Sequence, residues 1–235
     1  MTNQAIDKQL LMFDFDGTLI DSVPDLADAT NIMLSQLGMP TYPLQTIEKW
    51  VGNGARKLVE RALSGSVEVD DNLVLADVEA AEQLFFEAYA AHDVSKTVAY
   101  PDVDSGLKQL KDAGFTLALV TNKPIRFVPH ILAGMGWTSL FDMVLGGDSL
   151  PQKKPDAAPL LHVCATLNFL PSEALMIGDS INDILAGKNA GIETVGLSYG
   201  YNYGNDIRDS EPNQVFDSFA ELLTWLLNQQ SDTIN

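Results

Sequence analysis

Cysteine is almost absent from this chain of 235 residues, which contains only Cys164. A single cysteine excludes an internal disulfide framework and fits a reducing compartment. Cys164 lies in the apolar run 160–167, so we expect it to be a core residue. We therefore expect a cytoplasmic protein whose stability comes from packing and not from covalent crosslinks.

Basic residues are also scarce. The chain has 14 Lys and Arg against 32 Asp and Glu, which gives a net charge of −18. Nucleic acids and anionic membrane surfaces need a basic face on their partner, so this balance argues against both. It does not exclude a small anionic substrate, because a bound metal ion can reverse the local field.

Long hydrophobic runs are missing as well. No run approaches the roughly 18 apolar residues that a membrane span needs, and residues 1–8 have no apolar signal core. The three histidines, His92, His130 and His162, show no close metal-ligand spacing. With 46% hydrophobic residues, the chain has the composition of a globular protein with one domain and an insertion, or with two modest domains.

The most informative stretch that is present covers residues 11–22. Its apolar start predicts a strand buried on both faces, as in a parallel sheet. The strand ends in Asp14 and Asp16, whose side chains point the same way because they are two positions apart. Gly17 then permits a sharp turn. The alternative interpretation is a pair of surface acids that open a turn.

The rest of the chain separates into two patterns. Residues 22–92 predict only helices, over 24–37, 44–50, 55–63 and 73–91. From residue 102 onward helices alternate with short apolar strands, which predicts an α/β fold with a doubly wound parallel sheet. The expected strands are 115–120, 141–145, 174–178 and 193–197, and the expected helices are 103–113, 125–135, 156–168, 181–190 and 215–228. We expect a core of residues 1–20 and 98–235, with an all-helical cap domain, 21–97, inserted after the first strand.

Polar residues follow three of the predicted strands. Asp14 and Asp16 end the first, Thr121 and Asn122 end the strand 115–120, and Asp179 ends the strand 174–178. Asp183 lies four residues after Asp179, so the two can share a face of a helical turn. Parallel strands bind ligands at their carboxyl ends, and we expect these residues to meet there.

Clustered carboxylates stay ionised together only beside a cation or strong hydrogen-bond donors. Oxygen ligands suit a hard ion such as Mg²⁺, which also binds substrate phosphate. A carboxylate can act as a nucleophile on phosphorus when the negative charge is offset. The pair Lys153 and Lys154 could supply part of that offset. These residues together predict phosphoryl transfer on a small anionic phosphate ester.

At this point the sequence resembles the haloacid dehalogenase superfamily. The motifs Asp14-Phe15-Asp16-Gly17-Thr18, Thr121-Asn122, Lys154-Pro155 and Gly178-Asp179-Ser180-Ile181-Asn182-Asp183 are similar to its four ordered motifs. The helical segment after the first motif resembles the cap of the helical-cap branch. The resemblance covers nearly the whole chain.

The resemblance implies a role for each of these residues. Asp14 is expected as the nucleophile that forms an aspartyl-phosphate, and Asp16 as the acid that protonates the leaving oxygen and then deprotonates water. Mg²⁺ is expected on Asp14, the backbone carbonyl of Asp16, and Asp179, with Asp183 orienting metal-bound water or the lysine.

The phosphoryl group is expected to meet the remaining motif residues. Thr121 and Asn122 would bind its oxygens. Lys154, or less favourably Lys153, would neutralise charge on the nucleophile and the phosphate. The dehalogenases of the superfamily lack an acid at the position of Asp16, so Asp16 favours a phosphatase.

Three further segments are similar to one subgroup of the family, the phosphoglycolate phosphatases, which hydrolyse 2-phosphoglycolate to glycolate and phosphate. They are 50–55, 121–124 and 198–204. Backbone N–H groups at 52–55 could bind the substrate carboxylate where a helix begins, and Arg56 could assist. Alternatively, Gly52 and Gly54 form a simple turn and Arg56 is solvated.

Other activities are compatible with parts of the sequence. The motif Gly196-Leu197-Ser198-Tyr199-Gly200 matches the nucleophile elbow of serine hydrolases, but every histidine precedes it. A phospho-acceptor signalling module shares the acids and the lysine but has no helical insertion. A sugar-phosphate phosphatase or a phosphomutase would share all four motifs. We expect a monomer or a small homo-oligomer.

Overall fold

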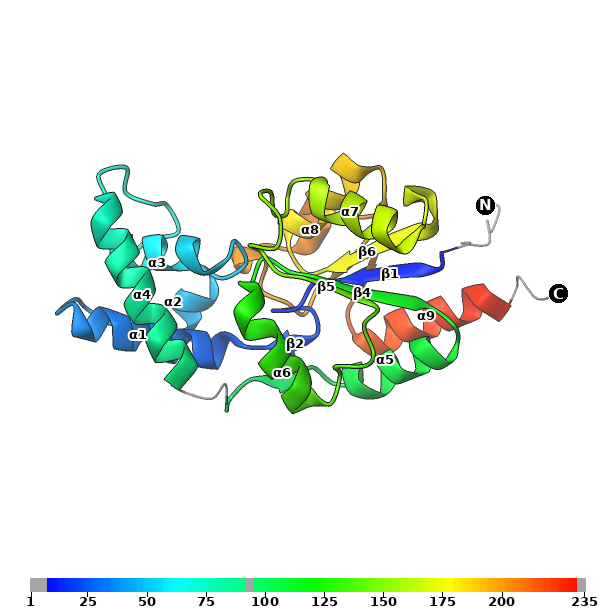
Figure 1. Cartoon of the computed structure of the whole chain (residues 1–235), viewed down its shortest axis with the longest axis horizontal. Coiled ribbons are helices and arrows are strands. Elements are labelled where there is room, and N and C mark those ends of the chain that lie inside the picture. The colour runs from blue at the N-terminus through cyan, green and yellow to red at the C-terminus, as the bar shows by residue number, and fades with distance from the viewer. Residues whose placement is uncertain (1–7, 92–94, 232–235) are drawn as a thin grey trace.

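The computed structural model describes residues 8–91 and 95–231 of the chain (Figure 1). The expected domain ranges also include residues 1–7, 92–94 and 232–235, and these lie outside the described residues, as does His92. The described chain forms two lobes. Figure 1 shows the helices α1 to α4 gathered on the left and the sheet with its helices on the right.

The larger lobe is built on a six-stranded sheet with the order β5-β4-β1-β6-β7-β8. All neighbouring strands in it are parallel. The strands are β1 (Leu10–Phe13), β4 (Thr116–Val120), β5 (Met143–Leu145), β6 (Ala174–Gly178), β7 (Glu193–Leu197) and β8 (Gln214–Phe216). The two strands that carry predicted aspartates at their ends, β1 and β6, are therefore neighbours at the centre of the sheet.

Alternating side chains of β1 explain why the sheet is covered on both faces. Leu11 and Phe13 pack into one apolar cluster, whereas Leu10 and Met12 pack into another. Helices α5, α6 and α9 cover the first face, and α7 and α8 cover the second (Figure 1). Their bounds are α5 (Val103–Asp112), α6 (Val128–Met135), α7 (Ala158–Leu167), α8 (Ile181–Ala190) and α9 (Phe219–Ser231). The predicted doubly wound parallel sheet is confirmed.

The smaller lobe is helical and has an apolar cluster of its own. Its helices are α1 (Val23–Gln36), α2 (Leu44–Glu48), α3 (Ala55–Ser64) and α4 (Leu75–Ala91). Pro24 lies in the first turn of α1, where its missing N–H costs nothing. Gly38 follows the helix with φ of +69°, a left-handed conformation that ends it.

The two segments that join the lobes pair with each other. Strand β2 (Ile20–Asp21) is antiparallel to β3 (Val98–Ala99), with Ile20 opposite Ala99 and Asp21 opposite Val98. The sequence did not predict this pair, because two residues are too few to show an alternating pattern. The buried carboxylate of Asp25 adds a second connection, since it accepts hydrogen bonds from Lys96 N and Thr97 Oγ1.

Three predicted helices differ in detail. The helix expected over 215–228 is wrong at its start, because 214–216 form β8 and α9 begins at Phe219. The helix expected over 125–135 opens with a 3₁₀ turn, η1 (Ile125–Phe127). The helix expected over 156–168 begins at Ala158, so Pro159 and not Pro155 lies in its first turn. The other 3₁₀ turns are η2 (Pro171–Glu173), η3 (Asn202–Gly204) and η4 (Ile207–Ser210).

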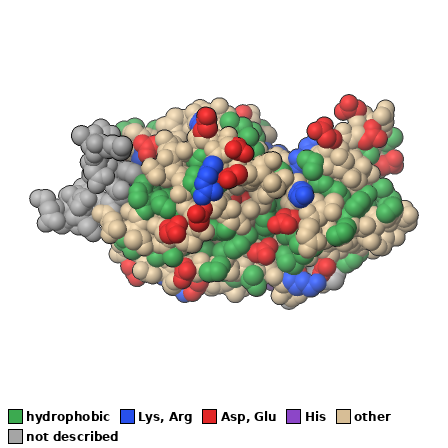
Figure 2. All heavy atoms as spheres, turned by 180° about the vertical axis from the view of Figure 1, so that it is seen from behind, with side chains coloured by type: hydrophobic (Ala, Val, Ile, Leu, Met, Phe, Trp, Pro, Cys, Tyr) green, Lys and Arg blue, Asp and Glu red, His purple; other side chains and the backbone are tan. Residues whose placement is uncertain are grey.

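The surface reflects the composition. Figure 2 shows Asp and Glu side chains spread over both lobes of one face, with Lys and Arg interspersed among them. None of the helices in the described part of the chain is both long enough and apolar enough to cross a membrane.

Candidate active site

A small cavity lies between the two lobes, at the carboxyl ends of β1 and β4. It encloses about 40 Å³. The wall from the sheet is polar and the wall from the helical lobe is mostly apolar. The polar wall includes Asp14, Asp16, Thr121, Asn122 and Lys123, and the opposite wall includes Leu26, Val51, Leu58, Phe85 and Tyr89. Asp14 and Asp16 thus line the same cavity, as their spacing predicted.

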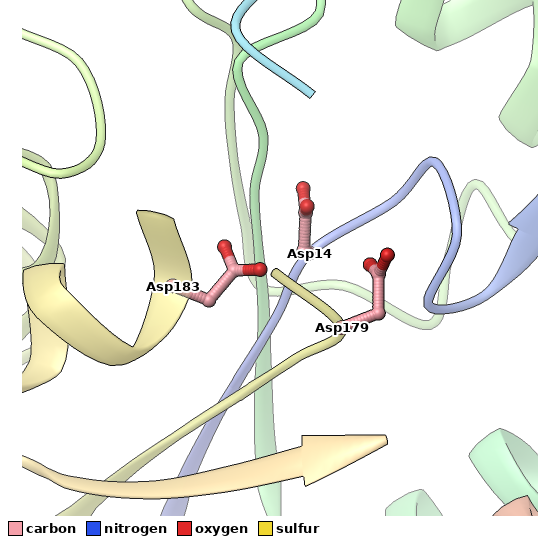
Figure 3. Close-up of side chains that lie close together, drawn as sticks. All are labelled: Asp14, Asp179 and Asp183. Carbon is pink, nitrogen blue, oxygen red and sulfur yellow. The ribbon is translucent and has the colours of Figure 1, made fainter. Parts of the chain in front are cut away.

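Three aspartates meet at the base of this site. Oxygens of Asp14, Asp179 and Asp183 all lie within 4.8 Å of one another, and all three residues are buried. Figure 3 shows the three carboxylates directed toward a shared space, with Asp14 coming from the end of β1, Asp179 from the end of β6 and Asp183 from α8. The parallel sheet therefore brings residues 165 and more positions apart into one cluster.

Lys154 partly neutralises the cluster. Its Nζ lies 2.9 Å from Asp14 Oδ1 and 2.6 Å from Asp183 Oδ1, and the side chain is 1% exposed. Burial by itself lowers the pKa of Lys154, but Asp14 and Asp183 outweigh it and the pKa is raised. The ammonium thus stays charged, and the structure selects Lys154 over Lys153 as the neighbour of Asp14.

One ammonium does not balance three carboxylates. Burial, and then the charge of Asp183, raise the pKa of Asp14 to about 7. Burial, and then the charge of Asp14, raise the pKa of Asp179 to about 8. Both shifts have the same physical meaning: the buried site lacks positive charge for its acids.

The residues present fit a divalent cation. Asp14 Oδ1 is buried and accepts no hydrogen bond of acceptable geometry, although Lys154 Nζ lies close to it. The available donors are carboxylate oxygens, which suit a hard ion such as Mg²⁺. A cation at this point would bind the Asp14 oxygen and offset the raised pKa values of Asp14 and Asp179 by favouring their ionised forms.

Asp179 is held by groups that the sequence did not reveal. Thr18 Oγ1 donates to Asp179 Oδ1 at 2.7 Å, and the backbone N–H of Tyr201 donates to Oδ2 at 2.8 Å. Gly17, with φ of +88°, and Gly200 leave the necessary room, because a Cβ on either would collide with the Asp179 carboxylate. Thr18 belongs to the first motif, and this position beside Asp16 and Gly17 is the feature from which the sequence could have indicated a role at the site.

Asp183 is oriented by its own helix. It lies at the third position of α8, and its Oδ2 accepts bonds from Ser180 N at 3.0 Å and Ser180 Oγ at 2.8 Å. This is a capping box, in which the first turn of a helix fixes a carboxylate. Its other oxygen, Oδ1, remains for Lys154.

Asp16 has different partners from Asp14. Lys123 Nζ lies 3.0 Å from Oδ1 and 3.3 Å from Oδ2, and Ser22 Oγ donates to Oδ1 at 2.5 Å. The same ammonium lies over the ring of Tyr89, 4.9 Å from its centroid. Lys123 was not predicted as a site residue, although it directly follows Thr121 and Asn122 in the sequence.

Thr121 and Asn122 lie at the end of β4, as predicted. Thr121 Oγ1 accepts a bond from Lys123 N at 3.2 Å. Asn122 Nδ2 donates to Lys154 O at 2.9 Å and to Gly52 O at 3.1 Å, which connects the sheet to the helical lobe. Asn122 Oδ1 is buried and makes no hydrogen bond.

Arg56 does not line this cavity but lines the adjoining pocket, together with Glu82, Asn122 and Lys153. Its guanidinium pairs with Glu82 at 3.3 Å and with Glu60 at 3.6 Å, and its side chain is 38% exposed. It lies on α3 and pairs across to α4 through Glu82. The expectation that Arg56 contacts the substrate stays a prediction, and in this structure two nearby acids pair with its guanidinium.

Comparison with known proteins places this site in a family. A sequence model of the family described as haloacid dehalogenase-like hydrolase matches residues 11–197. The chain belongs to this family. It is an enzyme of the hydrolase class.

Relatives of this hydrolase carry a more specific name. A protein of Psychrobacter arcticus named phosphoglycolate phosphatase is 66% identical over 223 residues, which cover 94% of this chain and 97% of the relative. A protein of the same name from Colwellia psychrerythraea is 49% identical over 92% of this chain and 96% of its own length. A crystal structure described as a predicted phosphoglycolate phosphatase from Haemophilus somnus superposes with a TM-score of 0.87 at 38% identity, covering 94% of this chain and 98% of that one.

Proposed function

We propose that this hydrolase is a magnesium-dependent phosphatase that converts 2-phosphoglycolate into glycolate and phosphate. The observation that carries the proposal is the buried cluster of Asp14, Asp179 and Asp183 with Lys154, whose member Asp14 lines a small cavity between the two lobes. Such a cluster can hold a phosphate beside a nucleophile and offset its charge.

Two aspartates would carry out the covalent steps. An oxygen of Asp14 attacks phosphorus, the bond from phosphorus to the ester oxygen breaks, and the leaving oxygen takes a proton from Asp16. Asp16 then takes a proton from a water molecule that attacks the aspartyl-phosphate, which releases phosphate and restores Asp14. Both carboxylates line the cavity, as this sequence of steps requires.

The surrounding groups would supply charge and orientation. Asp14, the backbone carbonyl of Asp16, and Asp179 are our proposed ligands of Mg²⁺, whose charge would offset that of the phosphate and the carboxylates. Lys154 contacts Asp14 and would add a second positive charge. Thr121 and Asn122 would bind the phosphoryl oxygens, and Asp183 holds Lys154 in place.

The substrate assignment rests on the relatives and on the cavity. The Psychrobacter and Colwellia proteins that cover nearly the whole chain are named phosphoglycolate phosphatases. A cavity of about 40 Å³ favours a compact ester over a large one. The alternatives are a phosphatase for another small or sugar phosphate and a phosphomutase of the same family.

Four accompanying expectations remain proposals. We propose that the lobes correspond to residues 1–20 with 98–235 and to 21–97, which the separate apolar clusters support. Closure of the helical lobe would exclude water from the site. The cytoplasmic location and the monomeric or small homo-oligomeric state rest on composition alone.

Phosphate release by the purified protein tests the proposal. The substrates are 2-phosphoglycolate, a hexose phosphate and a generic aryl phosphate, each with Mg²⁺ and with excess chelator. We expect magnesium-dependent turnover that strongly favours 2-phosphoglycolate. Preference for another ester would retain the mechanism and reject the substrate, whereas no release from any of them would reject the function. Asp16→Asn distinguishes a phosphatase from a phospho-acceptor module. A phosphatase with this substitution loses turnover, whereas a phospho-acceptor module would still be phosphorylated by its donor.

A further inference from the structure

The cavity contains a buried hydroxyl whose polar neighbour is the ammonium of Lys123. Tyr89, on α4, lines the cavity and is 2% exposed, and its hydroxyl makes no hydrogen bond of acceptable geometry. Its ring is fixed by Phe85, stacked at 5.9 Å, and by Phe127, edge-on at 5.0 Å. Beside an ammonium, which can only donate, the hydroxyl keeps its own O–H free to donate to a ligand in the cavity.

A buried ammonium lies beside this hydroxyl. Lys123 is 5% exposed and is the only basic side chain among the described residues that line the cavity. Burial by itself lowers the pKa of Lys123, but the charge of Asp16 outweighs it, so the pKa is raised and the group is charged. Its ammonium contacts both oxygens of Asp16 and also lies beside Tyr89, so a ligand that reaches Lys123 reaches the hydroxyl as well.

The start of α3 completes the same wall. Gly54 and Ala55 line the cavity where this helix of ten residues begins. No side chain caps its first turn, so the backbone N–H groups there are available to a ligand. These groups and the positive end of the helix dipole favour an anion.

We propose that Lys123, the Tyr89 hydroxyl and the first turn of α3 together bind a carboxylate of the substrate. The inference rests on the proposed phosphatase function and specifies which part of the substrate the site selects. The cavity would then accept short phosphomonoesters that carry a carboxylate close to the phosphate. Lys123, and not Arg56, is the cation that distinguishes them from neutral esters.

The rest of the wall supports an acid over a sugar. Leu58, Phe85 and Phe127 offer no hydrogen bonds to replace those that a polyol makes with water. A short carboxylate places its polar atoms at one end, where the ammonium and the hydroxyl lie, and its CH₂ group against the apolar side chains. The small volume of the cavity also favours a short acid over a sugar.

The test compares two substrates that differ only at this group. One is 2-phosphoglycolate, and the other is 2-hydroxyethyl phosphate, in which a neutral CH₂OH replaces the carboxylate. We expect Lys123→Met to lower the ratio of their kcat/KM values by about tenfold to a hundredfold, since a hydrogen bond to a charged group is lost. Any loss that Lys123→Met causes through Asp16 affects both substrates and cancels in the ratio.

Tyr89→Phe keeps the ring packing and removes only the hydroxyl, so it decides the question even if Lys123→Met does not fold. We expect it to lower the ratio by about threefold to tenfold. Arg56→Ala is the matched control and should leave the ratio within about twofold, since its guanidinium is held by Glu82 and Glu60. A ratio unchanged by both cavity variants, or lowered by Arg56→Ala instead, would overturn the inference.

Calorimetric binding separates this inference from the function. In Asp14→Asn with Mg²⁺, 2-phosphoglycolate should bind more tightly than 2-hydroxyethyl phosphate, and adding Lys123→Met should remove the preference. Equal affinities of Asp14→Asn for 2-phosphoglycolate and 2-hydroxyethyl phosphate would reject the carboxylate site. If the wild-type protein releases phosphate from neither compound, the phosphatase function fails, while the binding preference still decides the role of Lys123.

Discussion

Two buried lysines, Lys154 and Lys123, pair with the two aspartates of the first motif, Asp14 and Asp16. Both ion-pair partners of Lys154 belong to the sheet lobe, since Asp14 follows β1 and Asp183 belongs to α8. Lys123 joins parts of both lobes, because it binds Asp16 and lies over Tyr89 of α4. Asp16 in turn accepts a bond from Ser22, immediately before α1.

The difference separates two tasks that a phosphatase must perform. The charges around Lys154 do not depend on where the helical lobe lies, so the groups for phosphate chemistry are assembled by the sheet. Tyr89 joins Lys123 and Asp16 only when the helical lobe is in place. We infer that rate depends most on the Lys154 side and that selectivity depends most on the Lys123 side.

The largest effect should come from the nucleophile on the Lys154 side. We expect Asp14→Asn to lower kcat by about a thousandfold or more. Its melting temperature should not fall, because Asp14 is a buried acid repelled by Asp183, and the amide relieves that repulsion. Steady-state phosphate release and thermal melting measure the two quantities. Asp112→Asn, an exposed acid on α5, is the matched control, and normal turnover by Asp14→Asn would contradict the mechanism.

The two lysines should also differ in their contributions to stability. We expect Lys154→Met to lower the free energy of unfolding by about 3–5 kcal/mol, because it leaves Asp14 and Asp183 buried without their cation. Lys123→Met should cost about 1–3 kcal/mol, since Asp16 keeps the bond from Ser22. Denaturant unfolding in chelator gives both values, and a greater loss for Lys123→Met would invert the comparison.

A smaller effect should appear when pH is varied. The pKa of Asp14 is raised to about 7 and that of Asp179 to about 8, from an ordinary value of 3.8. Between about pH 4 and pH 8 the folded protein therefore holds more protons than the unfolded chain. The stability that these groups contribute is complete below about pH 4 and is lost as pH rises toward the folded-state values.

We accordingly expect the melting temperature in chelator to fall by a few degrees between about pH 5 and pH 8. Mg²⁺ should reduce that fall, because the ion favours the ionised carboxylates. Asp179→Asn removes one of the two groups, so its melting temperature should fall less than that of the wild type in chelator. A wild-type melting temperature that rises over this range in chelator would show that the cluster is not short of positive charge.

Much of the sheet side could be predicted from the sequence. The apolar runs of β1 and β6 are buried on both faces, so their composition alone indicates central parallel strands. Parallel strands end at one edge, which is why Asp14 and Asp179 could be expected to meet. Lys154 was found because the resemblance to the family placed it in a motif.

The groups that depend on tertiary contacts could not be predicted. Nothing in the sequence indicates that Tyr201 N would bind Asp179, or that Tyr89 would reach Lys123, since these contacts join segments that are distant along the chain. Arg56 was expected at the site from its place at the start of α3, and its ion pair with Glu82 on another helix could not be predicted. Strand β8 was missed because a strand of three residues just before a helix is too short to show an alternating hydrophobic pattern.

The pairing of β2 with β3 has a consequence for how this protein can be rebuilt. Ile20 and Ala99 are direct antiparallel neighbours, so the chain leaves the sheet lobe and returns to it at almost the same point. A two-residue hairpin turn from Asp21 to Val98 has the geometry to join these strands. We therefore expect that the segment between β2 and β3 can be deleted or replaced in the gene. The two points where it joins the sheet lobe, Asp21 and Val98, would keep their positions.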